Sequence, residues 1–317
     1  LEAIGGAATI NFGFINVAWA ILSVVLVVFL TGTPISYYAA KYGVDIDLLT
    51  RGAGFGYIGS TITSLIYASF TFIFFALEAA IMAMALHILF GISLAIGYVI
   101  SALLVLPLVT HGISYISRFQ VWSQPIWVIL QLVPLLFVFQ HPDSNFKDWI
   151  AFTGIGENET EARNFNLLLF GSASAILLSL VAQIGEQVDF LRFLPERPKA
   201  GRFKWWLALI AAGPGWIFFG ALKLFLGSFL AYFALTQGVD IDLADDPAHM
   251  YNLAFSLVFD NPTISLIVAC SFVVISQLKI NVANAYAGSL AWSNFFSRVT
   301  RTHPGRVIWT VFNVVIA

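Results

Sequence analysis

Residues 276–286 have the sequence Ser-Gln-Leu-Lys-Ile-Asn-Val-Ala-Asn-Ala-Tyr, and they directly follow an apolar run over residues 263–275. That run is apolar enough for lipid, yet a glutamine, a lysine and two asparagines come immediately after it. An ionisable group inside a membrane span costs several kcal/mol unless it faces a cavity or a partner. The sequence therefore predicts a buried polar site in a membrane-spanning helix, which is typical of a transport or binding site.

The composition places the chain in a membrane. Its 317 residues are 59% hydrophobic and only 10% charged, with a mean hydropathy of +0.88. A soluble domain carries about 25% charged residues, so this little charge predicts an integral membrane protein. The net charge of −2 says nothing about nucleic acid, but the sequence has no basic stripe, so we expect no nucleic-acid partner. The single cysteine, Cys270, lies in an apolar run, so we predict no disulfide framework, metal site or cofactor.

Long apolar runs recur along the chain, and a helical span needs roughly 20 such residues. The runs are continuous and lack the alternation of a membrane barrel, so we expect an all-α protein. Partial helices at 1–12 and 307–317 indicate one membrane domain over 1–317, cut from a longer protein at both ends. The predicted spans are 14–40, 58–90, 92–110, 120–139, 165–191, 205–235 and 262–290.

Basic and acidic loops alternate between these spans. By the positive-inside rule the basic loops face the cytoplasm, which gives a multi-pass protein of the inner membrane with lipid around it. The basic loop residues are Lys41, Arg51, Arg118, Arg192, Arg197, Lys199, Arg202, Lys204, Arg298, Arg301 and Arg306, and the acidic ones are Glu157, Glu159, Glu161, Asp240, Asp242, Asp245 and Asp246.

The loop over residues 41–56 is rich in glycine. It lacks the G-x-x-x-x-G-K-[ST] pattern of a phosphate-binding loop. Close packing or a hinge between two spans is the expected role.

Four ionisable residues lie well inside apolar runs: Glu78, Glu186, Lys223 and Lys279. Two are acids and two are bases, so one interpretation is a pair of structural ion pairs. The other is a site for a substrate or a coupling ion, since charges inside a membrane usually serve function. Lys223 has no polar neighbour in sequence, and we expect it to pair with one of the acids.

Two segments have the composition of a binding site. Phe74 and Glu78 lie one turn apart on a helix face, where a ring and a carboxylate would hold a flat ligand; the alternative is a lipid-facing phenylalanine beside a structural glutamate. Residues 179–190, Ser-Leu-Val-Ala-Gln-Ile-Gly-Glu-Gln-Val-Asp-Phe, combine polar groups with a glycine. That pattern favours a discontinuous helix whose unwound backbone lines a cavity.

Four segments in order resemble the nucleobase:cation symporter-1 family, which includes cytosine permeases, purine permeases and hydantoin transporters. Residues 40–51 are similar to the connection between its second and third helices, and 74–78 to its third-helix motif. Residues 188–193 resemble the end of its sixth helix, and 281–289 its eighth-helix asparagine motif. The resemblance spans essentially the whole chain.

The resemblance implies a twelve-helix transporter with a five-plus-five inverted repeat and discontinuous helices 1 and 6. This chain would run from the end of helix 1 to the start of helix 9, and the substrate would lie between helices 1, 3, 6 and 8. Glu2 would lie near the break in helix 1. The implied substrate-binding residues are Phe74 for stacking, Glu78 for amide binding, Ser179, Leu180, Ala182 and Gln183 on helix 6, and Asn281 and Asn284 on helix 8.

The sequence departs from the family at two places. Sodium-using members have hydroxyl residues where this chain has Lys279 and Ile280, and a fixed ammonium repels sodium. We therefore expect Lys279 to replace the ion, paired with Glu78, Glu186 or Glu2, with coupling to protons or none. Glu78 also stands where the family has glutamine, so either the ligand is cationic or rich in N–H groups, or Glu78 only pairs with Lys279.

The expected function is secondary transport of a nucleobase-like solute such as a purine or cytosine. The alternative is a sensor, in which a transporter-like membrane domain binds a solute and controls a fused signalling domain. An enzyme finds no support, because the sequence has neither metal-ligand spacing nor a nucleophile–base pattern.

Overall fold

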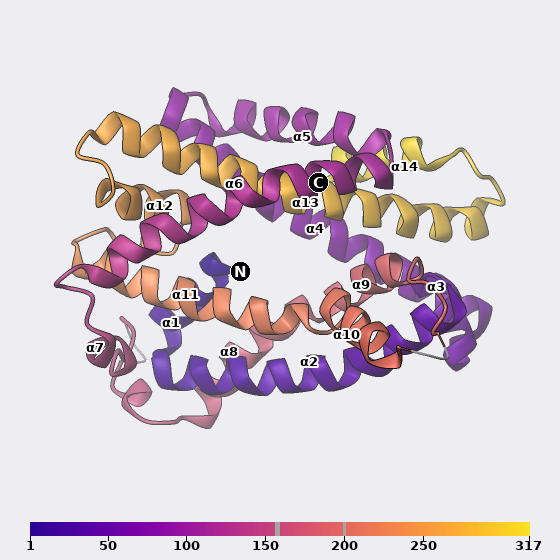
Figure 1. The fold of residues 1–317 in the computed structure, drawn as a ribbon, viewed down its shortest axis with the longest axis horizontal. Coiled ribbons are helices and arrows are strands. Elements are labelled where there is room, and N and C mark those ends of the chain that lie inside the picture. The colour runs from indigo at the N-terminus through magenta and orange to yellow at the C-terminus, as the bar shows by residue number, and fades with distance from the viewer. Residues whose placement is uncertain (156–158, 199–200) are drawn as a thin grey trace. The chain divides into compact units, whose positions relative to one another are not determined.

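The computed structural model describes residues 1–155, 159–198 and 201–317, and these residues form helices and connections without a strand (Figure 1). The predicted all-α architecture is confirmed for this part of the chain. Glu157 and Lys199, named above as loop charges, lie outside the described residues. The helices are α1 Glu2–Phe12, α2 Phe14–Tyr42, α3 Ile46–Thr50, α4 Gly56–Phe90, α5 Leu94–Thr110, α6 Ile113–Gln140, α7 Phe146–Ile150, α8 Leu167–Leu178, α9 Ile184–Leu191, α10 Arg202–Ala212, α11 Trp216–Thr236, α12 Pro247–Ser256, α13 Pro262–Thr300 and α14 Arg306–Ile316.

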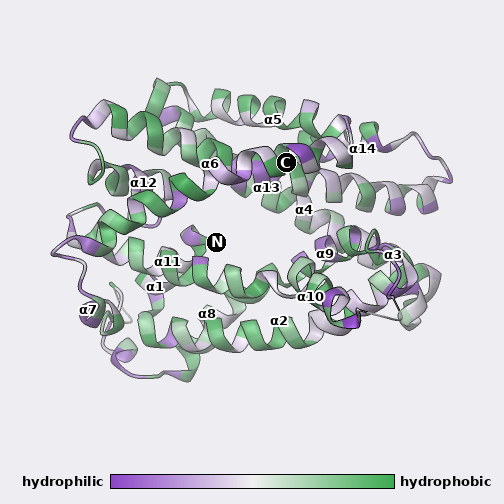
Figure 2. Cartoon of the chain, viewed as in Figure 1, coloured by the Kyte–Doolittle hydropathy of each residue, from purple (hydrophilic) through white to green (hydrophobic). Residues whose placement is uncertain are grey.

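Six helical stretches of the described chain are long and apolar enough to cross a membrane, and the shorter helices α5 and α14 are also apolar. Apolar residues cover most of the long helices, and polar residues concentrate in the connections (Figure 2). Large side chains such as Leu26 and Ile66 stay exposed, as lipid-facing groups do. The protein is a multi-pass membrane protein. The six stretches are Phe14–Tyr42, Ile46–Phe90, Ile113–Gln140, Leu167–Leu191, Arg202–Thr236 and Pro262–Thr300.

Several helix ends differ from the expectation, because Lys41 lies in α2, Arg202 and Lys204 lie in α10, and Arg306 lies in α14. Helix α6 begins at Ile113, so Arg118 lies in a helix rather than in a loop. Helix α13 continues to Thr300, so Arg298 is also helical. Hydropathy reports where hydrocarbon ends, whereas the backbone hydrogen bonds of a helix continue into the polar interface.

The chain forms two compact units, and it alternates between them. Unit 1 comprises Leu1–Gly43 and Val138–Leu253, and unit 2 comprises Val44–Phe137 and Ala254–Ala317. Each unit therefore contains one segment from the first half of the chain and one from the second half.

In unit 1, helices α1 and α11 cross at glycines. A Cβ atom added at Gly5 would lie 2.0 Å from the carbonyl oxygen of Leu224, and one added at Gly227 would lie 2.0 Å from that of Glu2. Such distances leave no room for a side chain, so the two backbones touch. This crossing brings the start of α1 against the middle of α11.

Helix breaks in unit 1 occur where the sequence supplies glycine or a polar run. Gly13 separates α1 from α2 at φ 72°, a conformation that favours glycine. The run 179–183 is a 3-10 segment between α8 and α9. The helix changes type here without unwinding, so the predicted discontinuous helix stays a prediction.

In unit 2, helices α4 and α13 pack along each other around Phe75, Ala79, Val282 and Ala285. Helix α14 joins them through the buried side chain of Asn313, whose Oδ1 accepts a hydrogen bond from Trp292 Nε1 at 2.9 Å. These contacts give unit 2 a core that is partly polar.

The α1–α11 crossing can be tested with one added methyl group. We expect Gly227→Ala to lower the thermal unfolding temperature of the purified protein in detergent by several degrees, because overpacking of this kind costs about 1–3 kcal/mol. Gly171→Ala on α8 is the matched control, since a Cβ at Gly171 meets nothing within 4 Å. It should leave the unfolding temperature unchanged or raise it, as alanine favours helix. Equal effects of the two substitutions would contradict the close crossing.

Candidate functional site

The predicted pair on α4 lies on one helix face, in unit 2. Phe74 and Glu78 are both half-buried, and the Phe74 ring packs against Phe70 with ring centroids 4.5 Å apart. The arrangement leaves a ring and a carboxylate one turn apart, as the sequence predicts.

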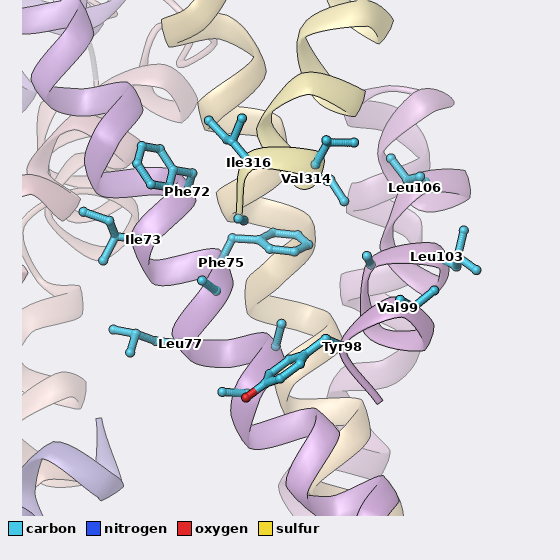
Figure 3. Close-up of a pocket in the computed structure, with 16 residues that line it drawn as sticks. Phe72, Ile73, Phe75, Leu77, Tyr98, Val99, Leu103, Leu106, Val314 and Ile316 are labelled. Carbon is cyan, nitrogen blue, oxygen red and sulfur yellow. The ribbon is translucent and has the colours of Figure 1, made fainter. Parts of the chain in front are cut away.

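An apolar groove of about 760 Å³ runs along a different face of α4 (Figure 3). Phe72 and Phe75 of α4, Tyr98 of α5 and Val314 of α14 are among the residues that line it. Neither Phe74 nor Glu78 does. The groove offers almost no polar partner, so it does not coincide with the predicted polar site.

The Lys279 ammonium is held by oxygen atoms of α6. Its Nζ donates to the backbone oxygen of Gln120 at 3.1 Å and to the Ser123 hydroxyl at 2.9 Å. Gln120 Nε2 returns a hydrogen bond to the Lys279 carbonyl at 2.7 Å. The prediction that a carboxylate would pair with Lys279 is therefore wrong for these contacts, because a carbonyl and a hydroxyl accept hydrogen bonds from the ammonium instead.

The two asparagines of α13 are linked to each other and to α4. Asn284 Nδ2 donates to Asn281 Oδ1 at 3.2 Å, and Asn281 Nδ2 donates to the Phe75 carbonyl at 3.2 Å. Both side chains are buried. Asn281 thus joins α13 to α4, and its amide is positioned by that contact.

The 3-10 segment of unit 1 carries the four predicted residues of helix 6. Ser179 is exposed, and its hydroxyl donates to the Ile176 carbonyl at 2.6 Å. Ala182 and Gln183 are half-buried, whereas Leu180 is buried and lines a small apolar space beside α2 and α11. The segment therefore presents polar and apolar groups on different sides.

Below this segment, α9 is anchored by an amide that sequence reasoning did not single out. Gln187 Nε2 donates to the Ser36 hydroxyl at 2.9 Å, and its Oε1 accepts from Trp216 Nε1 at 3.0 Å. The side chain is buried and bonded at both ends. Glu186, the neighbouring charge, is half-buried in the first turn of α9.

Glu2 and Lys223 form an ion pair in unit 1. Lys223 Nζ lies 3.4 Å from Glu2 Oε1, and the Tyr251 hydroxyl donates to the same oxygen at 3.0 Å. The Glu2 carboxylate is buried, while part of the Lys223 side chain is exposed. Tyr251 was missed by sequence reasoning, because it lies on α12, far along the chain from Glu2. Nearby, the Asp245 Cβ atom lies close to α1 at Gly6, and burial raises the pKa of the Asp245 carboxyl above its ordinary value.

A second charged cluster lies at the far end of α13, and the sequence analysis did not predict it. Arg298 donates to the buried Asp47 carboxylate and, at 2.6 Å, to the Ser60 hydroxyl. Arg51 lies 3.6 Å from the same carboxylate. The cluster ties α3 to α13 within unit 2.

The glycine-rich segment that follows α3 is not closely packed. Added Cβ atoms at Gly52, Gly54 and Gly56 would meet nothing within 4 Å. Residues Arg51–Phe55 form a π-helical turn, and Gly54 has a φ of 108°. Conformational freedom, rather than packing, explains the glycines, so the hinge alternative stays a prediction.

Comparisons with known proteins come from structure. No protein-family profile matches the sequence, and no curated protein does. Among solved structures the chain is similar to Mhp1, a nucleobase-cation-symport-1 family transporter, in a closed conformation with bromovinylhydantoin bound. The similarity covers 99% of this chain and 67% of that chain, with a TM-score of 0.59 and 16% identity. At this identity the likeness shows the fold, which is a transporter fold.

The Glu2–Lys223 pair can be tested by removing one charge and then both. We expect Lys223→Met to lower the unfolding temperature, because loss of one partner of a buried ion pair costs about 3 kcal/mol or more. Adding Glu2→Gln should recover most of the loss, since the amide needs no counter-charge and can still accept from Tyr251. Thermal unfolding of both variants in detergent gives the measurement. A double variant no more stable than Lys223→Met would show that the pairing is unimportant.

Proposed function

We propose that this chain is the membrane core of a secondary transporter for a small, flat, nitrogen-rich solute. A purine, a cytosine-like base or a hydantoin-like ring fits this description. The membrane is the cytoplasmic membrane, as the alternating loop charges predict. The observation that carries the proposal is the likeness to a transporter fold over 99% of the chain.

The way the chain alternates between the two units supports a five-plus-five inverted repeat. Unit 1 takes α1 and α2 from the first half of the chain and α8 to α11 from the second. Unit 2 takes α4 and α5 from the first half and α13 and α14 from the second. Two successive repeats, each giving its first helices to one unit and its later helices to the other, would produce this alternation.

The proposed solute ligands are the residues that the sequence resemblance implies. On α4, the Phe74 ring stacks on the solute and the Glu78 carboxylate accepts its N–H groups. On α13, Asn284 donates or accepts at the solute edge, positioned by Asn281. From the 3-10 segment, Ser179, Leu180, Ala182 and Gln183 supply the remaining contacts, because a change of helix type leaves backbone groups open to a ligand.

We propose further that coupling at the usual sodium position is absent and that Lys279 takes its place. The ammonium is bonded to neutral oxygens, so its positive charge is not cancelled by those contacts. A fixed cation there excludes a sodium ion by repulsion. The proposed coupling ion is then the proton, which a lysine or glutamate side chain of the protein can carry inside the membrane.

Stacking by Phe74 is tested by uptake of labelled bases. With the full-length protein in liposomes, we expect Phe74→Ala to raise the KM for the transported base at least tenfold, since stacking contributes about 1–3 kcal/mol. Phe72→Ala is the matched control, because that ring lines the apolar groove. An equal KM for the two variants would remove Phe74 from the site. Binding of a base without uptake under any gradient would favour the sensor.

Ion coupling is tested in the same liposomes. We expect uptake to follow an imposed pH gradient and to change less than about twofold when sodium is replaced by choline, because Lys279 repels the ion. Lys279→Met should abolish gradient-driven accumulation while exchange of labelled for unlabelled solute continues. Lys204→Met, at an exposed position in the first turn of α10, serves as control. Uptake that requires sodium in the unmodified protein would overturn the assignment.

A further inference from the structure

A cavity of about 260 Å³ lies in unit 1 at the end of α2, and none of the residues assigned to the solute lines it. Its lining comes from the last turns of α2, from the connection after α9, and from the start of α10. The lining residues are Tyr37, Ala40, Lys41, Glu196, Arg197 and Trp205.

Aromatic rings build a firm wall for this cavity. Tyr37 stacks on Trp206 with ring centroids 5.4 Å apart and planes 6° apart, and it meets Trp205 edge-on. Trp205 is buried, and its Nε1 donates to the Pro195 carbonyl at 2.8 Å. That bond fixes the connection carrying Arg197 against α10, so the cavity is shaped by packed side chains.

The cavity lining carries a net positive charge, and its cationic groups are accessible to a ligand. Lys41 and Arg197 are both exposed, and among the described residues neither forms an ion pair with a carboxylate. The Lys41 ammonium lies 4.9 Å from the Tyr42 ring centroid, a contact that orients the group without neutralising it. Glu196 is the single acid in the lining.

The position along the helices places this cavity at the membrane surface. The apolar span Phe14–Tyr42 ends here, and the span Arg202–Thr236 begins here. Tyrosine and tryptophan favour this level of a bilayer, and the loop charges predict that it faces the cytoplasm. Cytoplasmic leaflets carry anionic lipid, which clusters of lysine and arginine attract.

We propose that this cavity binds the phosphate headgroup of an anionic phospholipid, with Lys41 and Arg197 as its cationic ligands. The aromatic wall holds the glycerol region at the interface, and Glu196 disfavours a second negative charge beside it. A soluble phosphate shares the headgroup's charge, yet it gains nothing from a site at the membrane surface. The proposal does not depend on which solute the protein carries.

Native mass spectrometry of the delipidated full-length protein in detergent tests the proposal. The probes are phosphatidylglycerol, phosphatidylcholine with the same acyl chains, and inorganic phosphate. We expect one phosphatidylglycerol to bind in preference to phosphatidylcholine. The double variant Lys41→Gln, Arg197→Gln should bind it about 25-fold more weakly, since each basic group near an anionic surface adds about fivefold.

The double variant Arg202→Gln, Lys204→Gln is the matched control. It removes the same charge from exposed positions in the same region, but neither residue lines the cavity. Glu196→Gln should strengthen phosphatidylglycerol binding severalfold, a gain that misfolding cannot produce. Three results would each overturn the proposal: equal weakening by the two double variants, no preference for phosphatidylglycerol, or its displacement by millimolar inorganic phosphate.

Discussion

A carboxylate or an ammonium group in the hydrocarbon core must obtain its partners from the protein, because the lipid supplies none. In unit 1, Glu2 has Lys223 and the Tyr251 hydroxyl on one oxygen. In unit 2, Lys279 has a carbonyl and a hydroxyl of α6. These contacts fix which helices stand next to each other, since any other pairing would leave a charge without a partner.

The same requirement explains why glycine is concentrated where it is. Glu2 reaches Lys223 only because α1 and α11 approach until their backbones touch at Gly5 and Gly227. Elsewhere the breaks in helices fall at Gly13 and in the 3-10 segment Ser179–Gln183. Helix interruptions inside a membrane are tolerated when protein rather than lipid surrounds them, and Gly13 is buried within unit 1.

The spans were predictable because hydropathy depends only on neighbouring residues, and each predicted run contains a helix. The ends of α6 and α13 were not predictable, because polar helical turns outside the hydrocarbon have no hydropathy signal. Contacts between charged side chains were harder to predict, since partners such as Asp47 and Arg298 are far apart in the sequence. The partner of Lys279 was wrong because the prediction looked for an opposite charge, whereas neutral oxygens also accept hydrogen bonds. The placement of Phe74 and Glu78 on one helix face was predictable from their spacing in the sequence alone.

The two buried lysines differ in what their partners do to their charge. Lys223 lies against the Glu2 carboxylate, so the two opposite charges nearly cancel. The pair therefore contributes mainly by holding α11 against α1. Lys279 lies against neutral oxygens, so these contacts do not cancel the charge of its ammonium group. A persistent charge acts on any ionic or polar group that approaches α13, whereas a neutralised pair acts mainly on the helices it joins. For this reason we assign ion replacement to Lys279 and a structural role to Lys223, although both lysines interrupt apolar runs in the same way.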